Sequence, residues 1–219
     1  MLRRSRKSIL SILIVLVLSA TVLSVTPLLG QDNANTVVFA NNLDPTTLDP
    51  HIANDAQSNI FSLAFYEGLT RWKPNSLEIE PSLAESWDVS DDGLSWTFNL
   101  RSGVRFHDGS EFNAEAVQYS IERMRSINQG LAFVLDMVES IEVVDDYTVN
   151  IILAEPDITF FQGLPGVMMV SPSTFGDNDN DDNATEFAYD NVSGTGPYQL
   201  VSWERGRRLE IEKFDDYWG

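Results

Sequence analysis

The side chains that could carry out covalent chemistry are few in this sequence. Only His51 and His107 could serve as an imidazole base, no cysteine is present, and no G-x-S-x-G segment presents a nucleophilic serine. Each histidine adjoins a Pro or an Asp in a turn-forming stretch. A hydrogen bond to the backbone explains such a histidine better than a catalytic role does. These residues therefore argue against an enzyme.

The stretch Gly194-Thr195-Gly196 superficially resembles a phosphate-binding loop. Pro197 follows it, no Lys-Ser or Lys-Thr pair comes after it, and the next segment alternates like a strand. A phosphate loop needs a helix whose N-terminus faces the phosphate. We therefore predict a rigid turn that leads into a strand.

The acidic stretch at residues 177–183 (DNDNDDN) is the one candidate metal site. Asp177, Asp179 and Asp181 match the first three ligand positions of a calcium loop. However, an Asp stands where that loop has glycine, and Ala188 stands where it has its bidentate glutamate. A solvated acidic loop explains the stretch better, and we predict no cofactor. A titration of calcium against thermal stability distinguishes the two interpretations.

Residues 1–35 have the pattern of an export signal. A basic head, residues 1–7, precedes an almost wholly apolar stretch at residues 9–25. An uncleaved single-span anchor is the alternative, because about 17 apolar residues can just span a bilayer. No cysteine follows the apolar stretch, so a lipidated cysteine is excluded. Both alternatives place the rest of the chain in the periplasm or on the extracytoplasmic face of the cell membrane.

The chain is strongly acidic, with a formal net charge of −19 at pH 7. An acidic surface repels nucleic acid and anionic lipid, so neither is expected as a partner. Aromatic residues make up 11% of the chain and recur along it, which is typical of a folded domain. Because no disulfide can form, the exported domain must depend on its apolar core alone.

Short strands joined by tight turns dominate the expected secondary structure. In residues 95–100 apolar and polar side chains alternate, and Asp92-Gly93 before them supplies a hairpin turn. Four aromatic residues are expected in the core: Trp87, Trp96, Phe98 and Phe106. Further strands are expected at residues 36–40, 69–73, 140–144, 148–153, 167–170, 198–203 and 209–214.

The clearest predicted helix covers residues 113–125. Asn113 is a good N-cap, and Val117, Ile121 and Met124 form an apolar stripe. Other helical stretches are expected at residues 55–68, 131–138, 157–163 and 183–189. Strands and helices are mixed without regular β-α-β alternation, so we predict an α/β fold with substantial antiparallel content.

Several short motifs follow one another in a characteristic order. They are Leu48-Asp49-Pro50-His51, Tyr66-Glu67-Gly68-Leu69, Leu83-Ala84-Glu85-Ser86-Trp87, Val104-Arg105-Phe106-His107-Asp108-Gly109, Gly194-Thr195-Gly196-Pro197-Tyr198 and Asp216-Tyr217-Trp218-Gly219. In this order and spacing the chain resembles the family 5 extracellular solute-binding proteins of ABC importers, the group that contains the oligopeptide-, dipeptide- and nickel-binding proteins. The resemblance runs from about Leu43 to the last residue.

This resemblance implies a two-lobed α/β protein with a periplasmic-binding-protein-like type II fold, of which the chain holds the first lobe only. After residues 1–35, the expected parts are a sheet subdomain at residues 36–75 and again at 191–219, and an inserted α+β subdomain at residues 76–190. Tyr217 and Trp218 strengthen the expectation of a truncated chain, because two large aromatics usually pack against an element that follows them.

The resemblance also implies where a ligand would bind. By position, Asn54, Asp55 and Ala56 would line the cleft and meet a peptide backbone, and Phe133 would form part of a wall. The expected role is capture of a peptide or similar small solute for ABC permease subunits, by a monomer without catalysis. An exported envelope hydrolase and an anchored interaction domain are the alternatives.

Overall fold

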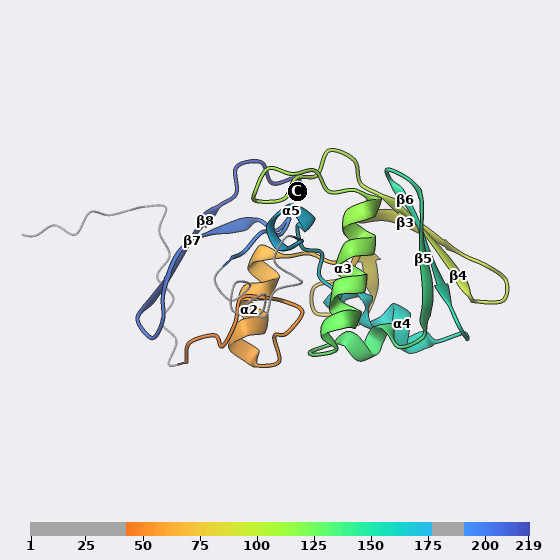
Figure 1. Cartoon of the computed structure of the whole chain (residues 1–219), viewed down its shortest axis with the longest axis horizontal. Helices are drawn as coiled ribbons and strands as arrows, with labels where there is room; N and C mark the ends of the chain where they lie inside the picture. The colour runs from red at the N-terminus through yellow and green to blue at the C-terminus, as the bar shows by residue number, and fades with distance from the viewer. Residues whose placement is uncertain (1–42, 177–190) are drawn as a thin grey trace, which may run out of the picture. The chain divides into compact units, whose positions relative to one another are not determined.

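Short helices and antiparallel strands make up residues 43–176 and 191–219, which are the residues that the computed structural model describes (Figure 1). The helices are α2 (Ala56–Phe65), α3 (Ala114–Ile127), α4 (Ile158–Gly163) and α5 (Pro172–Phe175), with 3₁₀ helices η1 (Ala132–Leu135) and η2 (Leu164–Gly166). The strands are β1 (Thr70–Trp72), β2 (Ile79–Pro81), β3 (Ala84–Val89), β4 (Ser95–Leu100), β5 (Val138–Asp145), β6 (Thr148–Leu153), β7 (Tyr198–Glu204) and β8 (Arg208–Lys213). In this part of the chain, no helix combines the length and apolarity that crossing a membrane requires.

Some predictions fall outside the described residues. They concern the export signal, the strand at residues 36–40, the helix at residues 183–189 and the calcium candidates Asp177, Asp179 and Asp181. The division into subdomains at residues 75, 190 and 191 also stays a prediction.

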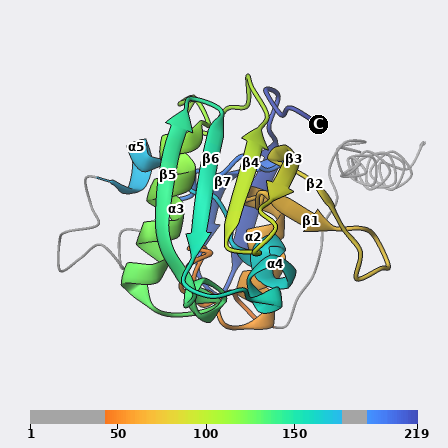
Figure 2. The ribbon, with the colours of Figure 1, turned by 90° about the vertical axis from the view of Figure 1, so that its right-hand side faces the viewer.

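The largest sheet has four antiparallel strands in the order β3-β4-β6-β5. Figure 2 shows this sheet in front of α3, which packs against β5 and β6. The hairpin predicted through Asp92-Gly93 is confirmed as β3–β4, and the strands predicted at residues 140–144 and 148–153 pair as the hairpin β5–β6. Gly93 has a φ of 74°, a left-handed conformation that glycine adopts without steric cost.

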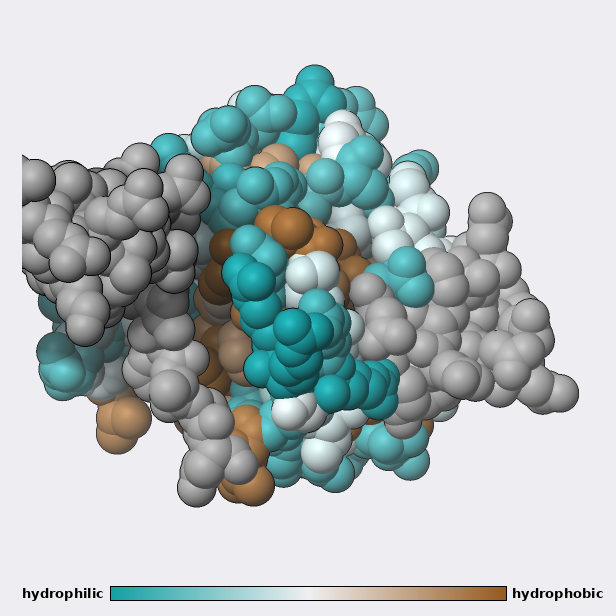
Figure 3. Space-filling model, turned by 90° about the vertical axis from the view of Figure 1, so that its left-hand side faces the viewer, coloured by the Kyte–Doolittle hydropathy of each residue, from teal (hydrophilic) through white to brown (hydrophobic). Residues whose placement is uncertain are grey.

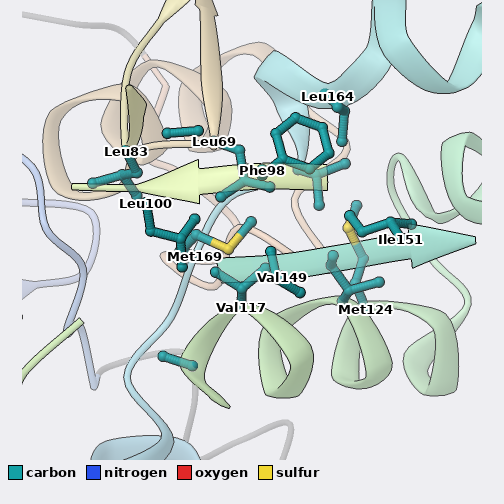
Figure 4. Close-up of a cluster of buried hydrophobic side chains, with 14 of the residues drawn as sticks. Leu69, Leu83, Phe98, Leu100, Val117, Met124, Val149, Ile151, Leu164 and Met169 are labelled. Atoms are coloured by element: carbon teal, nitrogen blue, oxygen red, sulfur yellow. The ribbon is translucent and has the colours of Figure 1, made fainter. Parts of the chain in front are cut away.

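The main core lies between this sheet and α3. Phe98 of β4 pairs with Val149 of β6, so both side chains leave the same face of the sheet. In Figure 4 they lie near Val117 and Met124 of α3, and all four side chains are fully buried. The stripe predicted for this helix is therefore confirmed as its core face. Full burial of such a side chain contributes about 1.5–3 kcal/mol.

The four aromatic residues predicted in the core differ in their burial. Phe98 and Phe106 are fully buried, as predicted. Trp87 and Trp96 are only partly buried, and both rings pack against Phe161 of α4 at the edge of the core. An indole near the surface can keep its polar N–H satisfied, and Trp96 Nε1 donates to the Gly93 carbonyl at 3.3 Å.

The caps of α3 follow from its flanking residues. The Asn113 side chain accepts a hydrogen bond from the Ala116 amide, as an N-cap does, and Glu115 lies in the positive first turn. Asn128 ends the helix in the left-handed conformation, with a φ of 53°. The helix therefore runs slightly beyond the predicted residue 125.

A second apolar cluster packs α2 against the β7–β8 hairpin. Phe65, Tyr66 and Phe175 are its largest fully buried members, and the strands predicted at residues 198–203 and 209–214 pair as β7 and β8. The other side of β7 exposes Val201. Figure 3 views the side of the molecule that carries this hairpin, and apolar residues interrupt a largely hydrophilic surface there.

The orientation of α2 differs from the simple amphipathic expectation. Ile60 and Leu63, apolar residues of the helical stretch predicted at residues 55–68, are exposed, whereas Ser58 and Ser62 are buried. Hydrogen bonds make this orientation possible. Ser58 Oγ accepts from the Thr46 and Thr47 amides at 3.1 and 3.2 Å, and Ser62 Oγ donates to the Ser58 carbonyl at 3.0 Å. A satisfied hydroxyl can be buried at little cost.

Two predicted elements take other forms. Residues 167–170 are buried but form no strand, and a single bridge joins Met168 to Gly68. The stretch at residues 131–138 forms the short 3₁₀ helix η1 and then enters β5. A run of apolar residues predicts burial in both places, but periodicity alone does not specify the backbone conformation.

Asp108 joins the loop after Phe106 to α5. Its Oδ2 accepts from Ser171 Oγ at 2.5 Å and from Thr174 Oγ1 at 2.6 Å, while its Oδ1 accepts from the Ser110 amide and hydroxyl. Burial raises the pKa of Asp108, but these hydrogen bonds outweigh burial and lower the pKa to about 2. The ionised carboxylate is therefore the form that the fold stabilises.

We expect the stability that Asp108 contributes to be lost in acid. Its folded pKa of about 2 lies below its ordinary value of 3.8, so the contribution is complete above the ordinary value and disappears as the pH falls through about 2. Urea unfolding at about pH 5 and about pH 2.5 checks this for the chain and for Asp108→Asn. The variant should lose less stability on acidification. An equal loss in both proteins would contradict the assignment.

Candidate ligand-binding site

The Leu48-Asp49-Pro50-His51 motif forms a tight turn around a buried carboxylate. The Asp49 carbonyl accepts from the Ala53 amide at 3.1 Å, and Asp49 Oδ1 accepts from the His51 amide at 2.9 Å. The Asp49 amide donates to Thr47 Oγ1 at 3.0 Å. Both the main chain and the side chain of Asp49 therefore fix the path of residues 49–53.

Arg123 reaches this turn from α3 and compensates the buried charge of Asp49. Its Nη2 lies 2.7 Å from Asp49 Oδ2, and its Nη1 lies 3.1 Å from Asp49 Oδ1. Asp49 is 0% exposed and Arg123 is 6% exposed. The guanidinium also stacks on the Phe175 ring at 4.6 Å. Two parallel N–H···O bonds are the strong geometry for such a pair.

His51 extends the buried network to another segment. Its Nε2 lies 2.8 Å from the Met168 carbonyl, and its Nδ1 lies 2.9 Å from Arg123 Nη1. A carbonyl only accepts and a guanidinium only donates, so His51 carries its proton on Nε2. His107 Nε2 similarly lies 3.0 Å from the Gly196 carbonyl. The prediction that backbone hydrogen bonds explain both histidines is confirmed.

Asp55 forms a second polar cluster, at the start of α2. Its Oδ1 accepts from the Gln57 and Ser58 amides, and its Oδ2 accepts from Thr46 Oγ1 at 2.6 Å and Ser58 Oγ at 2.5 Å. Burial raises the pKa of Asp55, but these hydrogen bonds outweigh burial and lower the pKa to about 2. Asp55 is thus an ionised N-cap with its carboxylate already occupied.

Asn54 lies between these two clusters and is exposed. Among the described residues, neither its main-chain groups nor its side-chain amide has a hydrogen-bond partner. Its neighbours on both sides are fixed, by Asp49 and by Asp55. A fixed backbone with free donors and acceptors can hydrogen-bond an extended peptide at a low entropic cost.

Gly130 brings the loop before η1 against the same turn. A Cβ atom at this position would lie 3.2 Å from the Ala53 and His51 carbonyl oxygens, and its φ is +56°. Glycine therefore permits both the close approach and the left-handed backbone. Phe133, three residues further along in η1, is 56% exposed. The loop that carries Phe133 and the turn that carries Asn54 thus adjoin at Gly130.

Glu67 organises a third polar cluster, at the end of the described chain. Its carboxylate accepts from Thr195 Oγ1, Tyr217 OH and Trp218 Nε1 at 2.9, 3.0 and 2.7 Å. Burial raises the pKa of Glu67, against the opposing effect of these donors. Arg101 stacks on the Trp218 ring at 4.3 Å. The two aromatic residues expected to pack on a following element therefore find partners earlier in the chain.

Sequence reasoning missed Arg123 and Gly130 as parts of this arrangement. One signal was present for Arg123, because it lies seven residues after Ala116 on the buried side of α3. A cation in an apolar stripe indicates a buried partner, since unpaired buried charge is costly. Gly130 comes shortly after the end of α3, where a glycine is expected as a turn residue. Its contact with residues 51–53 therefore could not be predicted from the sequence.

A metal site has no support in residues 43–176 and 191–219. No group of three or more His, Cys, Asp or Glu side chains there could hold an ion. Asp49 is paired with Arg123, and Asp55 accepts from amides and hydroxyls. Around Asn54, the described residues form hydrogen-bonded turns whose carboxylates already have partners.

The chain belongs to the family 5 bacterial extracellular solute-binding proteins, because the model of the family's middle region matches residues 78–219. The resemblance inferred from the motifs is thereby confirmed. The glutathione-binding protein GsiB of Pectobacterium atrosepticum is 37% identical over 177 residues, which cover 79% of this chain and 33% of GsiB. The probable D,D-dipeptide-binding periplasmic protein DdpA of Escherichia coli is 34% identical over 181 residues, which cover 80% of this chain and 35% of DdpA.

Solved structures share the fold of the chain. NikZ from Campylobacter jejuni, in complex with Ni(L-His), is 30% identical with a TM-score of 0.72, and the match covers 84% of this chain and 36% of NikZ. The oligopeptide-binding protein AppA from Bacillus subtilis, in complex with a nonapeptide, is 27% identical with a TM-score of 0.73, and the match covers 80% of this chain and 35% of AppA. The chain thus has part of the type II periplasmic-binding-protein fold, as predicted, and spans about a third of the length of the curated relatives it matches.

Proposed function

We propose that this chain is the first-lobe part of the substrate-binding component of an ABC importer. It captures a peptide or similar small solute outside the cytoplasm for delivery to membrane permease subunits, as a monomer and without catalysis. The observation that carries this proposal is Asn54, an exposed residue between two fixed polar clusters whose main-chain groups have no hydrogen-bond partner among the described residues. Family membership supplies the importer context.

Main-chain recognition at this site favours peptide-like solutes. Hydrogen bonds to a ligand backbone are independent of its side chains, so they suit ligands of varied sequence. Three of the named relatives agree in chemistry, since glutathione, a D,D-dipeptide and a nonapeptide all contain amide groups, whereas the Ni(L-His) of NikZ contains none. Asn54, Asp55 and Ala56 are the proposed contacts, with Phe133 as an apolar wall. The Asp55 carboxylate contributes through the backbone that it fixes.

Selectivity and tight binding would need a second lobe. In the proposed mechanism, two lobes close around the solute, and the ligand favours the closed state through contacts with both. One lobe supplies only part of these contacts. We therefore expect the 219-residue chain to bind peptides weakly. The dissociation constant should lie in the millimolar range, which corresponds to a binding free energy of about −4 kcal/mol. Tight binding in calorimetry would contradict this expectation.

The site is tested by following the amide NMR signals of the chain while glutathione is added. Signals of Asn54, Ala56 and Phe133 should shift together along one binding curve. Asn75 is the control, because it is also an exposed asparagine outside the helices and strands but lies between β1 and β2. A response confined to other parts of the chain would refute the site. Peptidase or esterase activity of the purified chain would favour the hydrolase alternative.

A further inference from the structure

We propose that Arg123 is a positioning residue for the ligand-contact segment at Asn54. This inference rests on the proposed function for its ligand, although its structural part can be measured without one. Arg123 lies on the buried side of α3 and is directed away from solvent by its partners. It acts through Asp49 and His51, which it bonds simultaneously.

The geometry of the turn explains how a buried arginine controls an exposed residue. The Asp49 carbonyl accepts a hydrogen bond from the Ala53 amide, and the Asp49 carboxylate accepts one from the His51 amide. Arg123 bonds both oxygens of that carboxylate, so it fixes the orientation of the acceptor that holds the His51 amide. Asn54 follows Ala53 directly, and its own groups have no partner among the described residues that could hold it. Its position therefore depends on the residues that flank it.

The downstream flank is fixed separately. Asp55 caps α2 and bonds Thr46, which lies ahead of the motif. The hydrogen bonds of the Asp55 carboxylate go to Thr46, Gln57 and Ser58 rather than to Arg123, so they should survive when Arg123 is changed. Loss of the Arg123 contacts would then loosen residues 50–54 while α2 keeps its start. Because the two flanks are held by different hydrogen bonds, loosening of residues 50–54 can be measured separately from any change in α2.

Positioning matters here because the proposed contact uses backbone atoms. A loose segment must be ordered when ligand binds, and that ordering reduces affinity. A network that fixes the segment beforehand removes this cost, which is the role of supporting residues behind a binding site. Arg123 is suited to this role because lysine cannot reproduce its planar pair of N–H donors.

The test compares Arg123→Lys with Val149→Ala. Lysine keeps the charge but loses the paired geometry with Asp49 and His51. Val149 is a fully buried residue of β6 and belongs to the core under the four-stranded sheet, so its truncation destabilises the fold without touching the turn. Both proteins are examined at temperatures where their free energies of unfolding are equal. A general loss of stability then affects them alike.

Hydrogen exchange gives the structural readout. In Arg123→Lys the amides of Ile52 and Ala53, both donors to the Asp49 carbonyl, should exchange about tenfold faster than in the matched Val149→Ala protein. The Asn59 amide, which bonds the Asp55 carbonyl in α2, should exchange equally in both. Equal exchange at Ile52 and Ala53 in the two variants would overturn the positioning role.

A glutathione titration gives the functional readout. Its dissociation constant should rise about tenfold in Arg123→Lys and stay near the parent value in Val149→Ala. An unchanged constant with faster exchange at Ile52 and Ala53 would refute the effect on binding. If the parent chain itself does not respond to glutathione, the proposed ligand site fails for that probe. The exchange comparison then still decides whether Arg123 positions the turn.

Discussion

Gly194→Ala is expected to lower the free energy of unfolding by about 3 kcal/mol or more, because the added methyl overpacks a buried contact. A Cβ at this position would lie 2.1 Å from the Phe65 carbonyl oxygen and 2.5 Å from the Tyr66 ring. Both neighbours are fully buried, at 0% and 1% exposure, so neither can move aside without disturbing the second core. Urea unfolding of the two proteins measures the difference.

Gly103→Ala is the matched control. Gly103 has a φ of +74°, and no atom would lie within 4 Å of an added methyl group, so only backbone strain opposes alanine there. That strain costs about 1–2 kcal/mol. Gly194 has no such strain, and its expected loss comes from crowding alone. The explanation would be wrong if Gly194→Ala cost no more than Gly103→Ala.

The same crowding explains a motif that could be read only in part from the sequence. Pro197 and the following alternation correctly argued against a phosphate loop at Gly194-Thr195-Gly196. They could not reveal the reason for two glycines, which is the approach of this segment to the end of α2. The Gly196 amide donates to the Phe65 carbonyl at 2.9 Å. Such a contact joins residues far apart in sequence, and local patterns carry no information about it.

Local signals predicted local structure well. The turn at Asp92-Gly93 and the cap at Asn113 act within a few residues, and both occur as predicted. The orientation of α2 was beyond such signals, because its buried Ser58 depends on amides of the preceding loop. The candidate segment at Asn54 came from family resemblance. Its fixed geometry comes from Arg123, a partner in another element.

The ion pair between Asp49 and Arg123 leads to the second large prediction. Arg123→Ala should lower the free energy of unfolding by about 3–5 kcal/mol, because it leaves the Asp49 carboxylate buried without its partner. Arg71→Ala is the control, since the Arg71–Glu80 pair has a similar distance of 2.8 Å, but its side chains are 56% and 29% exposed. That pair should contribute about 0–1 kcal/mol. Similar losses in both variants, measured by urea unfolding, would contradict the role of burial.

The double variant Asp49→Leu/Arg123→Met tests what the pair does beyond compensating charge. Many buried ion pairs can be replaced by apolar residues without loss of stability. Here the His51 amide would lose Asp49 Oδ1 and the His51 ring would lose Arg123 Nη1, so two buried polar groups would be left without these partners. We therefore expect the double variant to be more stable than Arg123→Ala but about 1–3 kcal/mol less stable than the parent. Full recovery of stability would mean that His51 does not depend on the pair, and that the turn at Asn54 has another support.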